Sequence, residues 1–166
     1  MEEVGGLVLI PAAVDAVSVP VVAAGGFADG RGLVAALALG AQGILMGTRF
    51  MLATECILHE NVKRRLLDAQ ENETVMIQKS VQNPSRVLRN SVAEQVLAME
   101  ARGATLDDLM PLISGLRGRS LMQDGDLEAG TIACSQAIGL MHEVKPVRDV
   151  IADIMRQATE RAKVFA

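Results

Sequence analysis

The chain has 166 residues, of which 50% are hydrophobic and 22% charged, and its formal net charge is −4. This composition excludes a collagen-like, a disordered or a disulfide-framed protein, and the length corresponds to about one domain. Aromatic residues make up only 2%, with no Trp and no Tyr, so a base-stacking nucleic-acid surface and an aromatic membrane belt both lack the residues they need. Because the balance is acidic, a bound anion must be held locally by backbone amides or a single basic residue.

The compartment is predicted from the apolar stretches and the cysteines. The most apolar stretch, Leu33 to Gly47, spans about half a bilayer if it is helical. The first three residues, Met1-Glu2-Glu3, lack the basic segment of a signal peptide, and Cys56 and Cys134 form no recognisable disulfide framework. We therefore expect a cytoplasmic protein with neither a membrane nor a nucleic acid as its partner.

The first third of the chain predicts a β-α-β unit. Apolar spacings of three and four indicate a helix from Gly6 to Val17. The β-branched run Val19 to Ala24 and the run Gly43 to Met46 are typical of strands buried on both faces, as in a parallel sheet. Between them, Asp29 is placed to cap a helix that Gly40 ends.

The other two thirds are predicted to be mostly helical. Thr105 and Asp108 have the spacing of a capping box, and the segment 74–81 is either a short strand or an irregular crossing. The remaining helices are expected over Thr54–Ala69, Ser91–Ala101, the small-residue segment Thr131–Leu140, and the long segment that starts at Pro146.

Two glycine-rich turns carry the clearest chemical signal. Ala24-Gly25-Gly26 and Gly47-Thr48 each follow a predicted parallel strand. Turns that leave the carboxyl ends of adjacent strands converge on one crevice, where glycines let backbone N–H groups approach an anion closely. The pattern favours a phosphate site, of the kind that the loops after strands seven and eight form in (β/α)₈ barrels. The alternative is that these glycines only relieve crowding at the strand ends.

These turns lie within longer motifs that resemble the nitronate monooxygenase family, formerly called 2-nitropropane dioxygenases. That family includes NADH:quinone reductases, to which the similarity is strongest, and is similar to the FMN-dependent enoyl-ACP reductases. The resemblance runs across nearly the whole chain. Its most specific motifs are VPVVAAGGFADGRG at 19–32, AALALGA at 35–41 and MGTRF at 46–50.

The resemblance implies an α/β fold: the C-terminal part of an FMN-binding (β/α)₈ TIM barrel with a helical inserted domain. Residues 1–70 would be the last barrel units, 71–130 the inserted substrate-side domain, and 131–166 the return to the barrel. The FMN contacts carried over from the family are Ala24, Gly25, Gly26, Gly47, Thr48 and Gln136. NAD(P)H is implied as an electron donor, and a nitronate or a quinone as the small-molecule substrate.

The chain also departs from the family pattern. A complete barrel needs roughly 250 residues, so the chain corresponds to a C-terminal half. The family's catalytic histidine lies upstream of the helix that begins here near Gly6, and no histidine precedes His59; we therefore assign no catalytic residue. Ser135 replaces a glycine found beside Gln136 in many relatives. We expect a homo-oligomer, or a protein completed by the missing N-terminal half.

Alternatives from other classes remain open at this point. They are a non-catalytic truncated flavin-binding or interaction module, an enoyl-ACP reductase-like enzyme, and another phosphate-binding barrel enzyme acting on a nucleotide.

The other polar residues that could form a site are mostly explained by packing or by exposure to solvent. Cys56 and His59 share a helical face, but two ligands do not make a metal site. Cys134 is expected to be a packed thiol and His142 to be solvated. The pair Arg64-Arg65 is expected at a solvated helix end, and Arg49 pairs either with a phosphate or with a barrel carboxylate.

Overall fold

The computed structural model describes residues 4–165. The chain divides into two compact units, one made of residues 1–55 with 145–166 and the other of residues 56–144. Both units contain helices and strands, so the fold is α/β. The segment boundaries expected at residues 70 and 130 refer to a complete barrel and stay a prediction. Among the described helices, none is long and apolar enough to cross a membrane.

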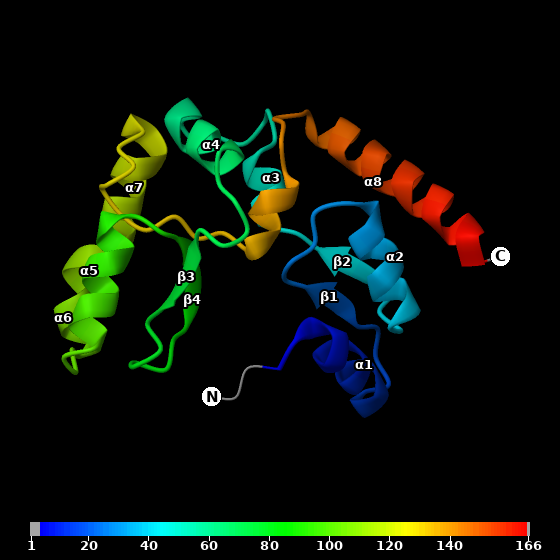
Figure 1. The fold of residues 1–166 in the computed structure, drawn as a ribbon, viewed down its shortest axis with the longest axis horizontal. Coiled ribbons are helices and arrows are strands. Elements are labelled where there is room, and N and C mark those ends of the chain that lie inside the picture. The colour runs from blue at the N-terminus through cyan, green and yellow to red at the C-terminus, as the bar shows by residue number, and fades with distance from the viewer. Residues whose placement is uncertain (1–3, 166) are drawn as a thin grey trace. The chain divides into compact units, whose positions relative to one another are not determined.

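The first unit is built on the expected β-α-β arrangement, with β1 and β2 paired in parallel and α2 joining them (Figure 1). Asp29 caps α2 as predicted, because its side chain accepts hydrogen bonds from the N–H groups of Arg31 and Gly32. Gly40, which follows α2, has φ +91°, a conformation that glycine adopts without strain. The elements are α1 (Gly6–Ala16), β1 (Val22–Ala24), α2 (Gly30–Ala38), β2 (Gly43–Leu45), α3 (Thr48–Met51), α8 (Val147–Ala162) and η2 (Lys163–Phe165).

The prediction that both strands are buried on both faces is wrong. Ala23 is 3% exposed and packs with Ala36 and Ala41, whereas Val22 is 56% exposed and Leu45 61%. The core of this unit covers one face of the sheet. The first strand is also shorter than the apolar run 19–24, since pairing begins only at Val22.

Helix α8 packs against α2 at a glycine (Figure 1). The N–H of Gly30 donates to Oε1 of Gln157 at 3.1 Å. A Cβ at position 30 would lie 2.5 Å from the backbone N of Ala158 and 2.5 Å from the backbone O of Ile154. The absence of a side chain at Gly30 therefore sets how closely the two helices approach.

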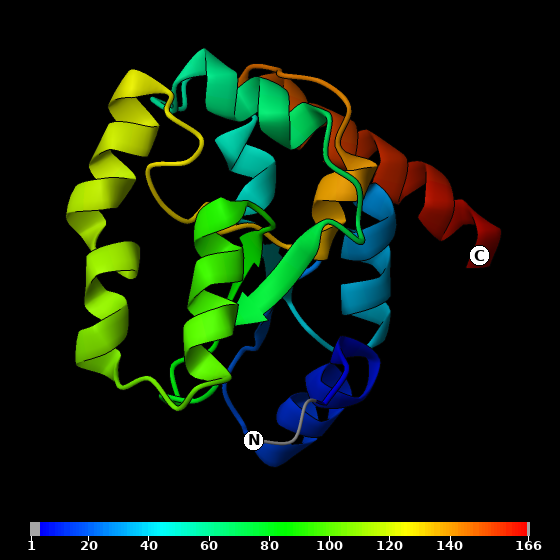
Figure 2. The same cartoon turned by 60° about the vertical axis from the view of Figure 1, so that its left-hand side comes forward.

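The second unit is formed by an antiparallel hairpin and helices, with α5 lying beside the hairpin (Figure 2). Thr105 and Asp108 form the predicted capping box at the start of α6. The elements are α4 (Glu60–Leu67), β3 (Thr74–Ile77), β4 (Ser85–Leu88), α5 (Ser91–Glu100), α6 (Leu106–Ile113), α7 (Gly115–Asp124) and the 3₁₀ helix η1 (Gln136–Leu140).

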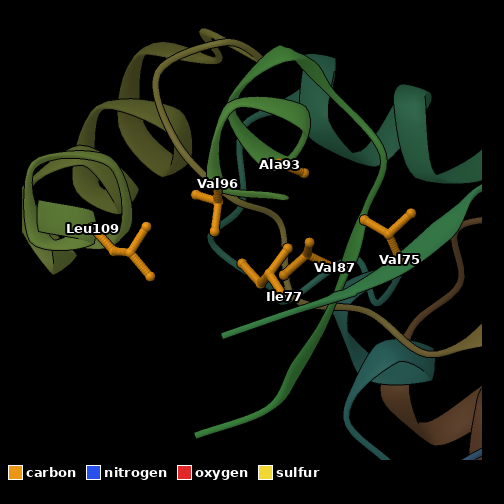
Figure 3. Close-up of a cluster of buried hydrophobic side chains, with 6 residues drawn as sticks. All are labelled: Val75, Ile77, Val87, Ala93, Val96 and Leu109. Atoms are coloured by element: carbon orange, nitrogen blue, oxygen red, sulfur yellow. The ribbon is translucent and has the colours of Figure 1, made fainter. Parts of the chain in front are cut away.

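One face of the hairpin packs on α5 and α6 through a buried aliphatic cluster (Figure 3). Strand β3 contributes alternate residues to it and β4 contributes one, which fits the alternation of a strand with one face in a core. The cluster consists of Val75, Ile77, Val87, Ala93, Val96 and Leu109.

Three expectations for this unit need correction. The helix expected over 54–69 begins only at Glu60, because the side chain of His59 caps it there. The helix expected over 131–140 is limited to η1, because residues 132–134 hydrogen-bond to β4 instead: Leu88 N–H donates to the carbonyl of Ile132, and Cys134 N–H to that of Arg86. Strand β4 was not expected, although the open question over 74–81 resolves as strand β3.

We predict that Gly30→Ala lowers the stability of the chain. The new methyl group would overlap backbone atoms of α8, which cannot rotate away, and overpacking of this kind costs about 1–3 kcal/mol. Urea unfolding measures the change. Gly118→Ala in α7 is the control, because nothing lies within 4 Å of its added Cβ, and helix propensity makes it neutral or stabilising. Equal stability of the two variants would contradict the packing argument.

We also predict that the isolated chain self-associates or is partly molten. The two-stranded parallel sheet leaves Val22, Leu45 and the apolar side chains of α1 exposed, including Leu7 at 77%, and unpaired strand edges recruit further strands. Analytical ultracentrifugation and hydrogen exchange check this together. A monodisperse monomer with strongly protected amides in both strands would disprove the prediction.

Candidate functional site

The candidate site begins at the edge of the sheet where both strands end. In the parallel register, Val22 faces Gly43 and Ala24 faces Leu45. Gly25 therefore leaves β1 at the same edge at which Met46 leaves β2. The predicted convergence of the two glycine turns is confirmed within the first unit.

The turn after β1 has a backbone that glycine alone adopts readily. Gly25 has φ +92° and Gly26 has φ +81°, a region that side chains with a Cβ rarely occupy. At both positions nothing lies within 4 Å of where a Cβ would be. These glycines are thus required by backbone conformation and do not relieve crowding within the described fold, although they leave open space beside the chain.

The turn after β2 also has open space beside its glycine, but the backbone angles of this glycine are ones that other residues adopt. Gly47 has φ −97°, and a Cβ there would also meet nothing within 4 Å. Gly47 begins the single-turn helix α3, since its carbonyl accepts from the N–H of Phe50 at 3.0 Å. Thr48 and Arg49 follow, and both are buried and make interactions within the fold.

Helix α2 offers less to a ligand than the turns do, because its N-terminus already holds a carboxylate. Asp29 Oδ1 accepts from the N–H of Arg31 at 2.9 Å, and its Oδ2 accepts from Arg31 Nε at 2.8 Å. Partial burial acts to raise the pKa of Asp29, but the Arg31 guanidinium and the N–H of Gly32 outweigh it and hold the pKa below its usual range. The backbone of the two glycine turns therefore forms the candidate anion site.

Gln136 belongs to the other unit, where it is the exposed first residue of η1. The structure places Ala24, Gly25, Gly26, Gly47 and Thr48 at one sheet edge, within residues that form a single unit. The contact of Gln136 with a cofactor remains a prediction.

The other candidate residues make contacts within the fold or lie exposed. His59 Nδ1 accepts from the N–H of Asn61 at 3.1 Å, which caps α4, and a Cβ at Gly125 would lie 2.1 Å from the same nitrogen. Within residues 4–165, no three His, Cys, Asp or Glu side chains gather as metal ligands would. Burial raises the pKa of the Cys134 thiol to about 11. His142 is exposed.

Comparison with known proteins gives a consistent result. The nitronate monooxygenase family profile matches residues 1–157. A curated relative from Rhodococcus jostii strain RHA1, named (3aS,4S,5R,7aS)-5-hydroxy-7a-methyl-1-oxo-octahydro-1H-indene-4-carboxyl-CoA dehydrogenase, is 32% identical over 92% of this chain and 54% of its own length. The chain thus spans about half the length of this relative.

Solved structures agree with the sequence comparison. FabK from Thermotoga maritima has a TM-score of 0.87 and 35% identity, with 99% of this chain and 52% of that one covered. Nitroalkane oxidase from Streptomyces ansochromogenes has a TM-score of 0.80 and 27% identity, with 98% and 46% covered. Together with the extent of the profile match, these similarities show that the chain belongs to the nitronate monooxygenase family.

Proposed function

We propose that this chain is the C-terminal half of an FMN-dependent oxidoreductase of the nitronate monooxygenase type. In this proposal β1 and β2 are the last two strands of a (β/α)₈ barrel. The observation that carries it is the parallel register, which ends both strands at one edge and brings the two glycine turns together. Family membership and the similarity to nitroalkane oxidase support the reaction class.

The turns fit the phosphate end of FMN. Gly25, Gly26 and Gly47 border space that no protein atom fills within 4 Å of a Cβ position, and backbone N–H groups at such turns suit a phosphate. We assign the phosphate anchor to Gly25, Gly26, Gly47 and Thr48, with Ala24 beside them. When bound, the flavin supplies the redox chemistry, accepting a hydride or electrons from one substrate and passing them to another.

In this proposal, residues outside this chain also contribute to the reaction. His59 is held as a helix cap and His142 is exposed, so we assign neither to proton transfer. In the proposal, this chain anchors the cofactor and its helical unit contributes to the substrate side. The remaining barrel units supply the general acid or base. The proposed substrates are an alkyl nitronate, or a quinone with NAD(P)H as the donor.

A second candidate function is a non-catalytic interaction module. The exposed faces of Val22 and Leu45 favour it, because such strands associate with other chains. A module of this kind would use the same sheet edges without turning over a substrate, so activity measurements separate the two functions.

We predict that Gly47→Ala weakens FMN binding. The backbone at Gly47 accepts a Cβ without strain, and the added methyl group would meet only a ligand; Gly25 and Gly26 are less informative because positive φ strains any substitution there. Fluorescence titration should show that the unaltered chain binds FMN more tightly than riboflavin, which lacks the phosphate. In the variant this difference should disappear.

The matched control is Gly43→Ala at the amino end of β2, where the added Cβ also meets nothing within 4 Å. It should retain the preference for FMN. Equal affinity of the unaltered chain for FMN and riboflavin, or a preference that survives in Gly47→Ala, would show that the anchor is misplaced.

A further prediction concerns turnover by the chain alone. Supplied with FMN, it should oxidise NADH or a nitronate at least about 10²-fold more slowly than a full-length relative, because a positioned acid or base contributes about 10²–10⁴-fold. Steady-state assays with the Streptomyces ansochromogenes enzyme as the reference measure the ratio. Comparable rates would mean that the chain contains a complete active site.

A further inference from the structure

The hairpin of the second unit carries two polar side chains on the face that lies away from the aliphatic cluster, together with Met76 and the buried Leu88. Val75, Ile77 and Val87 point into the cluster against α5 and α6 (Figure 3). Thr74 and Arg86 occupy the alternate positions of β3 and β4, and side chains at alternate positions of a strand face opposite sides of the sheet. Thr74 and Arg86 therefore share the face that does not contribute to this cluster.

Arg86 is a half-buried cation that pairs with no carboxylate of the described residues. One of its guanidinium N–H groups donates to Oγ1 of Thr74 at 3.1 Å. Within residues 4–165, this is the hydrogen bond that the Arg86 side chain makes, and no ion pair involves it. A guanidinium has five donors in a rigid fork, so most of the donors of Arg86 remain for another acceptor.

A second guanidinium adds to the positive charge at this place. Arg65 was expected at a solvated helix end, but it is half-buried and pairs with Glu73 at 2.8 Å. Burial raises the pKa of the Cys134 thiol to about 11, while the charges of both Arg65 and Arg86 act to lower it. Both arginines therefore lie near a thiol that stays neutral at pH 7, and Glu73 offsets only one of the two charges.

We propose that Arg86 and Thr74 form a binding site for a phosphate group of an organic ligand. The Thr74 hydroxyl accepts its hydrogen bond from Arg86, so its own proton is available to a ligand oxygen. A fork of N–H donors beside an O–H donor suits a phosphate, which offers several acceptor oxygens.

Arg86 and Thr74 belong to the unit of residues 56–144, whereas the residues of the proposed FMN anchor belong to the other unit. The inference goes beyond the proposed function, whose substrates are an alkyl nitronate or a quinone, because it adds a phosphate ester as a ligand of the helical unit. One relative is named as acting on a CoA thioester, and CoA provides a phosphate-rich probe of that class.

Equilibrium dialysis of the full chain against radiolabelled CoA at low ionic strength tests the site, because dialysis tolerates self-association and low salt preserves interactions of partly exposed charges. Inorganic phosphate should compete with CoA. Pantetheine, which lacks the phosphates, and acetate should not. The variant Arg86→Gln should bind CoA about tenfold or more weakly, the expected effect of losing charge-assisted hydrogen bonds.

Arg89→Gln is the matched control, because Arg89 is an exposed arginine on the same segment that pairs with Glu94. It should bind CoA as the unaltered chain does. Thr74→Val keeps the charge of Arg86 and removes the hydroxyl, so it should also weaken binding, which guards against an effect of Arg86→Gln on folding alone. Circular dichroism compares the folding of all variants.

The site is disproved if the unaltered chain does not bind CoA, if acetate competes as well as phosphate, or if Arg89→Gln weakens binding as much as Arg86→Gln. A negative dialysis result would not disprove the flavin anchor, because FMN binding by Gly47→Ala and Gly43→Ala is measured separately. Conversely, if the unaltered chain bound FMN no more tightly than riboflavin, the flavin anchor would be disproved and the dialysis result would be unchanged.

Discussion

The parallel pairing of β1 with β2 is the interaction on which the candidate site depends. Parallel strands run in one direction, so their carboxyl ends, and the turns that follow, must lie at one edge of the sheet. The register that sets Ala24 opposite Leu45 brings together turns that are far apart along the chain. A shift of one residue would turn each side chain to the other face of the sheet, and Ala23 would leave the small core that it forms with Ala36 and Ala41.

Small residues allow this unit to be held together by few elements. Ala23, Ala36 and Ala41 let α2 lie close to the sheet, and Gly30 lets α8 lie against α2 with backbone atoms almost in contact. The other face of the strands is largely uncovered, since Val22 is 56% exposed and Leu45 61%. Strands with this composition are typical of sheets covered on both faces, which agrees with a chain that spans about half the length of its relatives.

In the helical unit, one face of the hairpin packs into an aliphatic cluster, and the other face carries Thr74 and Arg86 beside the buried Leu88. Val75, Ile77 and Val87 bury their side chains against α5 and α6, and Arg86 and Thr74 are held in place by the same two strands. A cation held on a rigid hairpin loses little conformational freedom when it binds an anion. This pre-organisation separates Arg86 from the exposed arginines of the helices.

The sequence by itself determined the elements whose signals are local. Asp29 as a helix cap, the Thr105 and Asp108 capping box and the two glycine turns follow from residue types within a few positions of one another. The tertiary structure decided what depends on distant partners. Residues 132–134 hydrogen-bond to β4 and do not form a helix, and β1 buries Ala23 on one face while Val22 on the other is 56% exposed. Arg86 faces Thr74 because a hairpin sets their register. A side chain's neighbours across a sheet are fixed by pairing, which residue spacing along the chain does not encode.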